Sequence, residues 1–331
     1  MNSKNTNKFL STVISFATKG ARESSVRTVF TFLATIAVGA GIHVTAYGGV
    51  PLNNLQGTGG IAFNPLAYTA GLPWDEDEGG DATNAVERAD SALNGVVSRP
   101  QIGAWYVNLN DAGINWWAGS AALTFADRVE VSGGYGFINA HKYGDKSINT
   151  YNVGAKVRFL DENAFDTVWV PALAVGGVWK YTDSRTVEAF RLDDNGFDGY
   201  VVASKLITQT PVPVLLSAGL LLSDEVVNGV VGHNDYDVVA FGNIDILPAE
   251  NIAIGLEYKQ GVDAGDTSVT GGHSIRNHDY WDAHVAWFVT KKLSLVAAFA
   301  ETGDKDKFYR KGSVKNLGVG SGAVFSIQYQ F

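Results

Sequence analysis

Cysteine is absent from this chain of 331 residues, which excludes disulfide bridges and thiolate chemistry. Charged residues are also scarce, at 18% of the chain, whereas a soluble domain usually has about a quarter. Beyond residue 46 no apolar run is long enough for a membrane-spanning helix. The formal net charge is -9, which argues against nucleic acid as a partner, because binding it requires clustered lysine and arginine. Apolar residues (46%) and glycine (38 residues) are abundant instead, a mixture typical of strands between lipid and a lumen.

The first 46 residues have the pattern of a cleavable secretory signal. Basic residues from Lys4 to Arg27 precede a mostly apolar core at 29–40, and Val44-Thr45-Ala46 satisfies the small-residue rule before a cleavage site. A core of this length is short for a membrane span. We therefore expect residues 1–46 to be a signal peptide that is removed; the alternative is an anchor helix that stays attached.

The last two thirds of the chain alternate apolar and polar residues, which is the period of β-strands rather than of helices. We expect the apolar face of each strand to point outward to lipid and the polar or small face to point inward. Aromatic residues at strand ends favour a membrane barrel over a β-sandwich. The twelve predicted strands are 101–109, 114–125, 129–140, 149–161, 168–182, 196–208, 213–223, 236–248, 251–261, 280–292, 293–303 and 318–331.

The connectors between these strands are alternately short and long. The short ones are 126–128, 162–167, 209–212, 248–250 and 291–292. The long ones are 141–148, 183–195, 224–235, 262–279 and 304–317, with the short connector 110–113 as the one weak case. Outer-membrane barrels have short periplasmic turns and longer external loops. The pattern therefore predicts an all-β, transmembrane antiparallel barrel of about twelve strands over 101–331, with both of its ends in the periplasm.

The end of the chain has an alternating apolar row, formed by Phe325, Ile327, Tyr329 and the terminal Phe331. This arrangement resembles the C-terminal signal by which the barrel assembly machinery recognises its substrates. We therefore expect that machinery, outer-membrane lipid and lipopolysaccharide as partners, in the outer membrane of a Gram-negative bacterium.

The segment 47–100 has a different composition. Residues 57–71 are apolar and rich in glycine, with Pro65 inside, and they precede an acidic run at 75–78 and an expected helix at 83–93. A thirteenth strand at 60–70 would break the even strand count. We expect a plug in the lumen or a periplasmic extension; a barrel of fourteen strands, with the second added strand within 84–98, is the alternative.

Several runs resemble an uncharacterised proteobacterial outer-membrane β-barrel family, the domain of unknown function DUF3034. They are IGAWYVNLNDAGINWWAGSAALTFADRVEVS (102–132), DGYVVASKL (198–206), NIAIGLEYK (251–259), DYWDAHVAWFV (279–289) and LSLVAAFAETG (293–303). The chain departs from the family by an apparent insertion at about 72–99. The resemblance implies a barrel and brings no assigned activity, so it transfers no catalytic residue.

Charged and polar side chains on the inward faces are the candidate lumen lining. They carry both signs, which predicts either a conduction path of weak ion selectivity or a ladder of paired charges that holds the strand register. Glu130 on one strand and Lys156 with Arg158 on the next are the clearest pair. The predicted lumen-lining residues are Glu130, Lys156, Arg158, Asp245, Glu257, Lys259, Asp282 and His284.

Catalytic and metal sites have little support. His284, beside Asp282, is the one strand histidine, and no G-x-S-x-G nucleophile elbow occurs. The acidic clusters at 75–78 and 193–194, and that of Asp263 with Asp266, match no complete calcium loop. The pair His273 and His278 has no third ligand nearby. We therefore expect no enzyme activity, metal or cofactor, and no nucleotide site, because no phosphate-binding glycine pattern is present.

Two functions remain open for such a barrel. The first is a channel or gated pore for small solutes. The second is a non-conducting structural or anchoring barrel that holds a periplasmic or extracellular protein partner.

Overall fold

The computed structural model describes residues 52–72, 96–141, 146–183, 193–231, 236–267, 273–303 and 318–331. The expected signal peptide, the acidic run at 75–78 and the expected helix at 83–93 lie outside these ranges. None of the described residues forms a helix long and apolar enough to cross a membrane.

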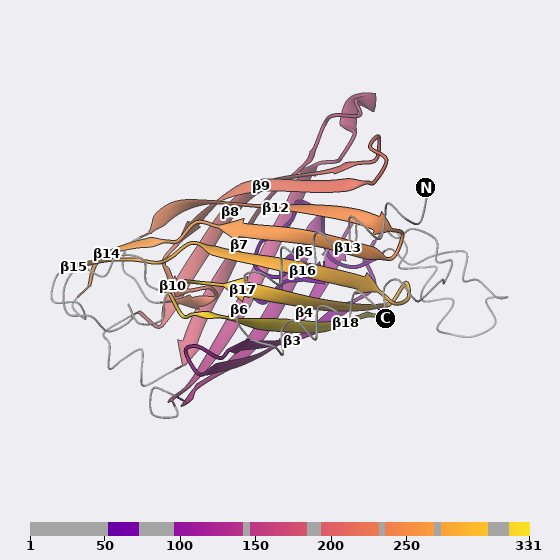
Figure 1. The fold of residues 1–331 in the computed structure, drawn as a ribbon. Coiled ribbons are helices and arrows are strands. Elements are labelled where there is room, and N and C mark those ends of the chain that lie inside the picture. The colour runs from indigo at the N-terminus through magenta and orange to yellow at the C-terminus, as the bar shows by residue number, and fades with distance from the viewer. Residues whose placement is uncertain are drawn as a thin grey trace.

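Twelve antiparallel strands close into a barrel, in which the last strand pairs with the first (Figure 1). Their number confirms the prediction of twelve and excludes fourteen. The barrel strands are β3 (Gln101–Leu109), β4 (Ile114–Phe125), β5 (Val129–Ala140), β6 (Lys146–Leu160), β7 (Ala172–Asp183), β8 (Asn195–Ile207), β9 (Val214–Ser223), β12 (Asp237–Ala249), β13 (Ile252–Lys259), β16 (Tyr280–Phe288), β17 (Leu293–Glu301) and β18 (Ser321–Gln330).

Short and long connections lie at opposite ends of the barrel, called here the short-turn end and the long-loop end. The C-terminus lies at the short-turn end, on the right in Figure 1. Two hairpins lie at the long-loop end: β10 (Glu225–Val227) with β11 (Val230–Val231), and β14 (Asp263–Thr267) with β15 (His273–Arg276). The remaining two strands, β1 (Leu52–Asn53) and β2 (Gly59–Gly60), pair only with each other and belong to residues 52–72.

The predicted boundary between the fourth and fifth strands was wrong. The turn was expected at 162–167, but β7 begins only at Ala172. Pro171 has no N–H for a ladder, and Asn163 and Phe165 have positive φ angles around a short 3-10 turn. Trp169 therefore lies in an exposed turn instead of a strand.

The outer surface of the barrel is apolar, as the alternation predicts. Val153 on β6 and Leu256 on β13 are more than half exposed, whereas their neighbours Asn152 and Glu257 are buried inside. The C-terminal row on β18 has the same arrangement, because its outward side chains Ile327 and Tyr329 are exposed. A sheet that closes on itself leaves no strand edge with unpaired backbone hydrogen-bonding groups, and its apolar exterior suits lipid as the solvent. The chain is therefore a transmembrane barrel of the outer-membrane type.

The interior differs from the expectation of polar and small side chains. Large apolar side chains, among them Trp105, Trp116, Phe241 and Tyr200, also point inward and are buried. They belong to two apolar clusters that contain residues of the segment 52–72. These inward rows are apolar because they pack against this segment and not against water.

Candidate functional site: the occupied lumen

Residues 52–72, called here the inner segment, lie inside the barrel. Every residue from 52 to 70 is buried. The segment turns tightly at Asn54, whose side-chain oxygen accepts hydrogen bonds from the backbone of Gln56 and Thr58. Gly57 completes this turn with a φ of 98°, and a Cβ there would lie 2.7 Å from the Gly133 oxygen of the wall. Glycine is therefore required for both the backbone conformation and the close approach.

Glu130 and Lys156 hold the middle of the inner segment. They face each other on β5 and β6, with 2.9 Å between Lys156 Nζ and Glu130 Oε2, and both are fully buried. Glu130 accepts hydrogen bonds from the backbone N–H of Gly59 (2.8 Å) and Ala70 (2.7 Å). Lys156 donates to the Gly59 oxygen at 2.8 Å. The ion pair therefore has its remaining hydrogen-bonding capacity satisfied by the segment, as a buried pair requires.

Glu257 on β13 holds the next turn of the inner segment. Its Oε2 accepts hydrogen bonds from the N–H of Ala62 (2.9 Å) and Phe63 (3.0 Å), and its Oε1 accepts one from Asn64 (3.1 Å). The Asn64 side chain donates to the backbone oxygens of Gly242 (3.2 Å) and Tyr258 (3.0 Å). A carboxylate that accepts three N–H groups forms a strong, charge-assisted contact.

Neutral groups hold the start of the segment. Trp105 Nε1 donates to the Asn53 oxygen at 2.8 Å. Gln328 accepts from the Asn53 N–H at 2.7 Å and donates to the Asn53 oxygen at 2.9 Å. Together with Ser204, which accepts from the Ala67 N–H at 2.9 Å, these contacts fix the segment to opposite sides of the wall.

His284 lies between two aspartates, close to Glu257. Its Nδ1 is 2.8 Å from Asp282 Oδ1 and its Nε2 is 2.7 Å from Asp245 Oδ1. Within the described residues, Glu257, Asp282 and His284 are the one group whose ligand atoms lie within 4.8 Å of one another, as a metal site requires. Both ring nitrogens and both Glu257 oxygens already have partners, so the arrangement is that of a hydrogen-bonded network. No described serine hydroxyl is hydrogen-bonded to His284, so a Ser-His pair is not formed here.

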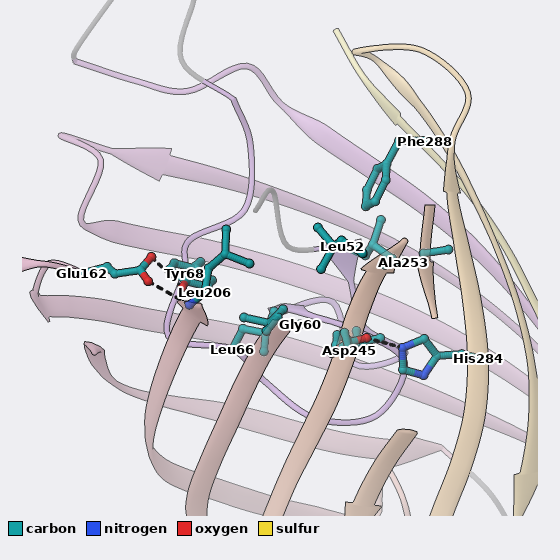
Figure 2. Close-up of a pocket in the computed structure, with 14 residues that line it drawn as sticks. Leu52, Gly60, Leu66, Tyr68, Glu162, Leu206, Asp245, Ala253, His284 and Phe288 are labelled. Carbon is teal, nitrogen blue, oxygen red and sulfur yellow. Dashed lines mark hydrogen bonds and ion pairs between the residues drawn. The ribbon is translucent and has the colours of Figure 1, made fainter. Parts of the chain in front are cut away.

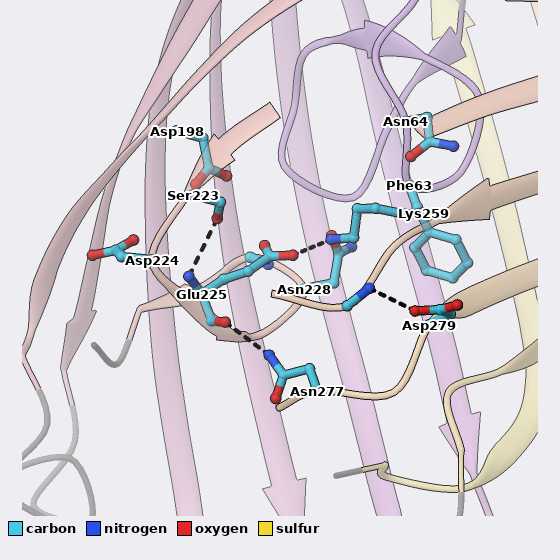
Figure 3. A network of polar contacts seen from close by, with 12 residues as sticks. Phe63, Asn64, Asp198, Ser223, Asp224, Glu225, Asn228, Lys259, Asn277 and Asp279 are labelled. Carbon is cyan, nitrogen blue, oxygen red and sulfur yellow. Dashed lines mark hydrogen bonds and ion pairs between the residues drawn. The ribbon is translucent and has the colours of Figure 1, made fainter. Parts of the chain in front are cut away.

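The hairpin of β10 and β11 is buried at the long-loop end of the lumen, where its polar side chains form part of the network in Figure 3. Glu225 of this hairpin forms an ion pair with Lys259, which also donates to Asn228 at 2.6 Å. Asn277 donates to the Glu225 backbone oxygen at 2.9 Å. Val230 packs in the same apolar cluster as Leu52 of the inner segment. The hairpin and the inner segment therefore form one continuous packed core.

Lys180 on β7 lies next to this hairpin. Its Nζ is 2.7 Å from Asp198, 3.8 Å from Glu225 and 3.9 Å from Asp224. Burial acts to raise the pKa of Glu225, but Lys259 and Lys180 outweigh it, so that the pKa is lowered. Burial raises the pKa of Asp224 to about 6, despite the opposing charge of Lys180. The pKa values of these two adjacent carboxyl groups are therefore shifted in opposite directions.

The predicted lumen residues are placed as follows. Glu130, Lys156, Asp245, Glu257, Lys259, Asp282 and His284 point inward and are buried. Arg158 does not line the lumen: it lies at the short-turn rim, where it donates to the Asp127 oxygen (2.6 Å) and pairs with Asp161 (3.2 Å). The last inward positions of β6 are at the barrel rim, where a long side chain reaches the turns.

The sequence prediction missed three charged groups of the lumen. Lys180 and Asp198 lie on the inward faces of predicted strands, so the same alternation identifies them. Glu225 lies in a predicted loop, and no local pattern indicates that this loop folds inward. Of the proposed histidine pair, His278 Nδ1 is 2.7 Å from the Asp279 oxygen, and the side chain of His273 is outside the described part.

Comparison with known proteins identifies a family but no activity. The family model DUF3034, described as a protein of unknown function, matches residues 91–311. No curated protein matches the chain. Similar solved structures include the KdgM porin (12% identity, 70% of this chain and 99% of that chain, TM-score 0.45) and the NanC porin (8%, 70% and 98%, 0.41). The outer membrane protein Omp33 of Acinetobacter baumannii is similar as well (12%, 72% and 100%, 0.37). Nothing about this chain's function follows from such distant likenesses.

Proposed function

The chain belongs to the DUF3034 family, which has no assigned activity, so we propose a function from the geometry of the lumen. The protein is an outer-membrane channel for small solutes, and the inner segment is its plug. The observation that carries this proposal is the nature of the lumen's contents. A separate stretch of chain fills the barrel, bound through its backbone to carboxylates of the wall.

The wall supports a passage once the inner segment leaves. Glu130, Lys156 and Glu257 point into the lumen and would become hydrated. Inward glycines add width: a Cβ on Gly134 would lie 3.0 Å from the Gln56 oxygen of the segment. A barrel of this strand number filled only by its own wall needs large inward side chains at such positions. Polar contacts also suit a reversible plug, because water replaces them when the segment moves.

The second candidate is an anchoring barrel that conducts nothing. The apolar contacts of the inner segment favour it. Leu55, Ala62 and Phe63 pack in one apolar cluster, and Ile61 and Leu66 in the other. Burial of each large aliphatic or aromatic side chain stabilises the folded state by about 1.5–3 kcal/mol. The sum of these contacts keeps the inner segment inside the barrel. A channel then requires a trigger that overcomes this packing.

Conductance in planar lipid bilayers separates the two candidates. The full chain and a variant that lacks residues 52–72 are inserted and compared, with folding checked by mobility on unheated SDS gels. The channel proposal predicts a closed full chain and a steadily conducting deletion variant. A folded deletion variant that does not conduct overturns the proposal and favours the anchor. A full chain that already conducts without any segment motion contradicts the role of the segment as a plug.

A further inference from the structure

A cavity of about 150 Å³ lies in the lumen near the short-turn end, between the wall and the inner segment (Figure 2). The inner segment contributes Leu52, Ile61, Leu66 and Tyr68 to one side. The wall contributes inward-facing apolar residues at the short-turn ends of five consecutive strands. These residues are Leu206 on β8, Leu215 on β9, Leu247 on β12, Ala253 on β13, and Ala286 and Phe288 on β16.

Two small side chains create this space. Ala253 and Ala286 face each other in the ladder between β13 and β16, so the wall has no large side chain at these two adjacent inward positions. On the opposite side, Gly60 of the inner segment also has no side chain. An empty apolar cavity of this kind destabilises a protein, and a ligand that fills it recovers the lost contacts.

The size and lining select the chemistry of the ligand. A volume of about 150 Å³ with a mostly apolar lining has room for a single-ring molecule such as benzene. The ionisable groups of the lining are the carboxyls of Glu162 and Asp245, the imidazole of His284 and the phenol of Tyr68, and no lysine or arginine is among them. Lys205 pairs with Glu162 at 2.7 Å, and His284 pairs with Asp245 at 2.7 Å. An anionic ligand would therefore have to compete with these carboxylates for cations that already have partners.

The polar edge of the cavity accepts hydrogen bonds. Tyr68 donates its hydroxyl to Glu162 at 2.8 Å, and burial followed by the charge of Glu162 raises the pKa of Tyr68 well above its ordinary value, so it stays a donor. Asp245 Oδ1 accepts from His284 Nε2 at 2.7 Å, as Figure 2 shows. A carboxylate oxygen has a second lone pair, which a ligand hydroxyl can use.

We propose that this cavity is a binding site for a small, neutral, single-ring molecule that carries one hydrogen-bond donor, such as a phenol. The site needs the inner segment in place but does not need conduction, so it stands apart from the channel proposal. Benzene fits the apolar lining without a polar contact, and benzoate places a negative charge beside Glu162 and Asp245. The expected order of affinity is phenol, then benzene, then benzoate.

Fluorine NMR with 4-fluorophenol tests the site in the full chain reconstituted in lipid bilayers. The Ala286→Leu variant fills the cavity, and Ala283→Leu is the matched control, because Ala283 lies on the outer face of the same strand. We expect saturable binding that phenol displaces, at least tenfold weaker in Ala286→Leu and unchanged in Ala283→Leu. Unheated gel mobility verifies that each variant is folded.

Three outcomes overturn the proposal. A signal that is equal in all three proteins and never saturates is partition into lipid. Binding that is displaced by a long-chain fatty alcohol but not by phenol assigns the cavity to an acyl chain. Binding of benzoate as tight as that of phenol contradicts the role of the two carboxyl groups. Each result is independent of conductance, so the channel proposal and this one fail separately.

Discussion

Replacing Glu257 by glutamine weakens the hold on the inner segment by a calculable amount. In the native chain the carboxylate accepts three backbone N–H groups, from Ala62, Phe63 and Asn64. A glutamine oxygen keeps two of these bonds at neutral strength, about 1 kcal/mol each in place of about 2. The third N–H then faces an amide NH₂ and loses its bond. The total loss is about 4 kcal/mol.

Part of this loss is offset. Asp282 lies directly opposite Glu257 on β16 and is fully buried, so removing the Glu257 charge relieves repulsion between two carboxylates. Taking this relief as about 2 kcal/mol, the net weakening is about 2 kcal/mol, which raises the population of the released segment about thirtyfold.

Single-channel recording measures this change. The Glu257→Gln variant is expected to open about thirtyfold more of the time than the native chain, with the same conductance per opening. Glu250→Gln is the matched control, because Glu250 lies exposed in the turn between β12 and β13. An open fraction equal in Glu257→Gln and the control would show that these three hydrogen bonds do not hold the proposed channel closed.

Three further predictions concern charged groups of the lumen and its rim. Because burial raises the pKa of Asp224 to about 6 from 3.8, its ionised form destabilises the closed hairpin above about pH 6, and the penalty disappears below about pH 4. Asp224→Asn therefore slows hydrogen exchange in β10 and β11 at pH 8, by about 2 to 3 kcal/mol of opening free energy, and has little effect at pH 4; an equal effect at both values refutes the pKa argument. Lys156→Met leaves Glu130 charged and buried, which costs about 3 to 5 kcal/mol and lowers the urea midpoint for unfolding in vesicles; an unchanged midpoint would refute this. Arg158→Ala breaks a rim ion pair with the half-exposed Asp161 and is expected to change that midpoint and the conductance hardly at all, so a large effect would place Arg158 in the conduction path.

The strands were predictable because lipid requires apolar side chains on their outer face, which produces a regular alternation in the sequence. The alternation in β3, β4 and β5 gave boundaries identical to the predicted ones. Boundaries failed where a turn replaced the ladder, as before Ala172, because Pro171 and the positive φ angles act locally and leave the alternation intact.

The contents of the lumen were less predictable. Period two places Lys156 or Glu257 inside, but it does not show what each one binds. Residues 57–71 are apolar and rich in glycine, which fits a buried segment equally well in the lumen or elsewhere. The inward positions of Trp105 and Trp116 were hard to predict for the same reason. Their packing partners in the inner segment become evident only in the folded molecule.

The closing contact of Glu225 could not be found from the sequence. It lies in a polar connector of ordinary loop composition, and its partners Lys259 and Lys180 come from distant strands. Long-range charge pairing of this kind has no local signature, because it depends on which loops the barrel brings together.

The position of the inner segment can be tested directly in the native membrane. The chain has no cysteine, so an Ala67→Cys, Ser204→Cys double variant carries only the two introduced thiols. Ser204 Oγ lies 2.9 Å from the Ala67 N–H, and both residues are buried, so a short bifunctional thiol reagent is expected to cross-link them in intact outer membranes. A folded double variant that forms no cross-link, and whose residue 67 reacts freely with a bulky water-soluble maleimide, would contradict a lumen closed by residues 52–72.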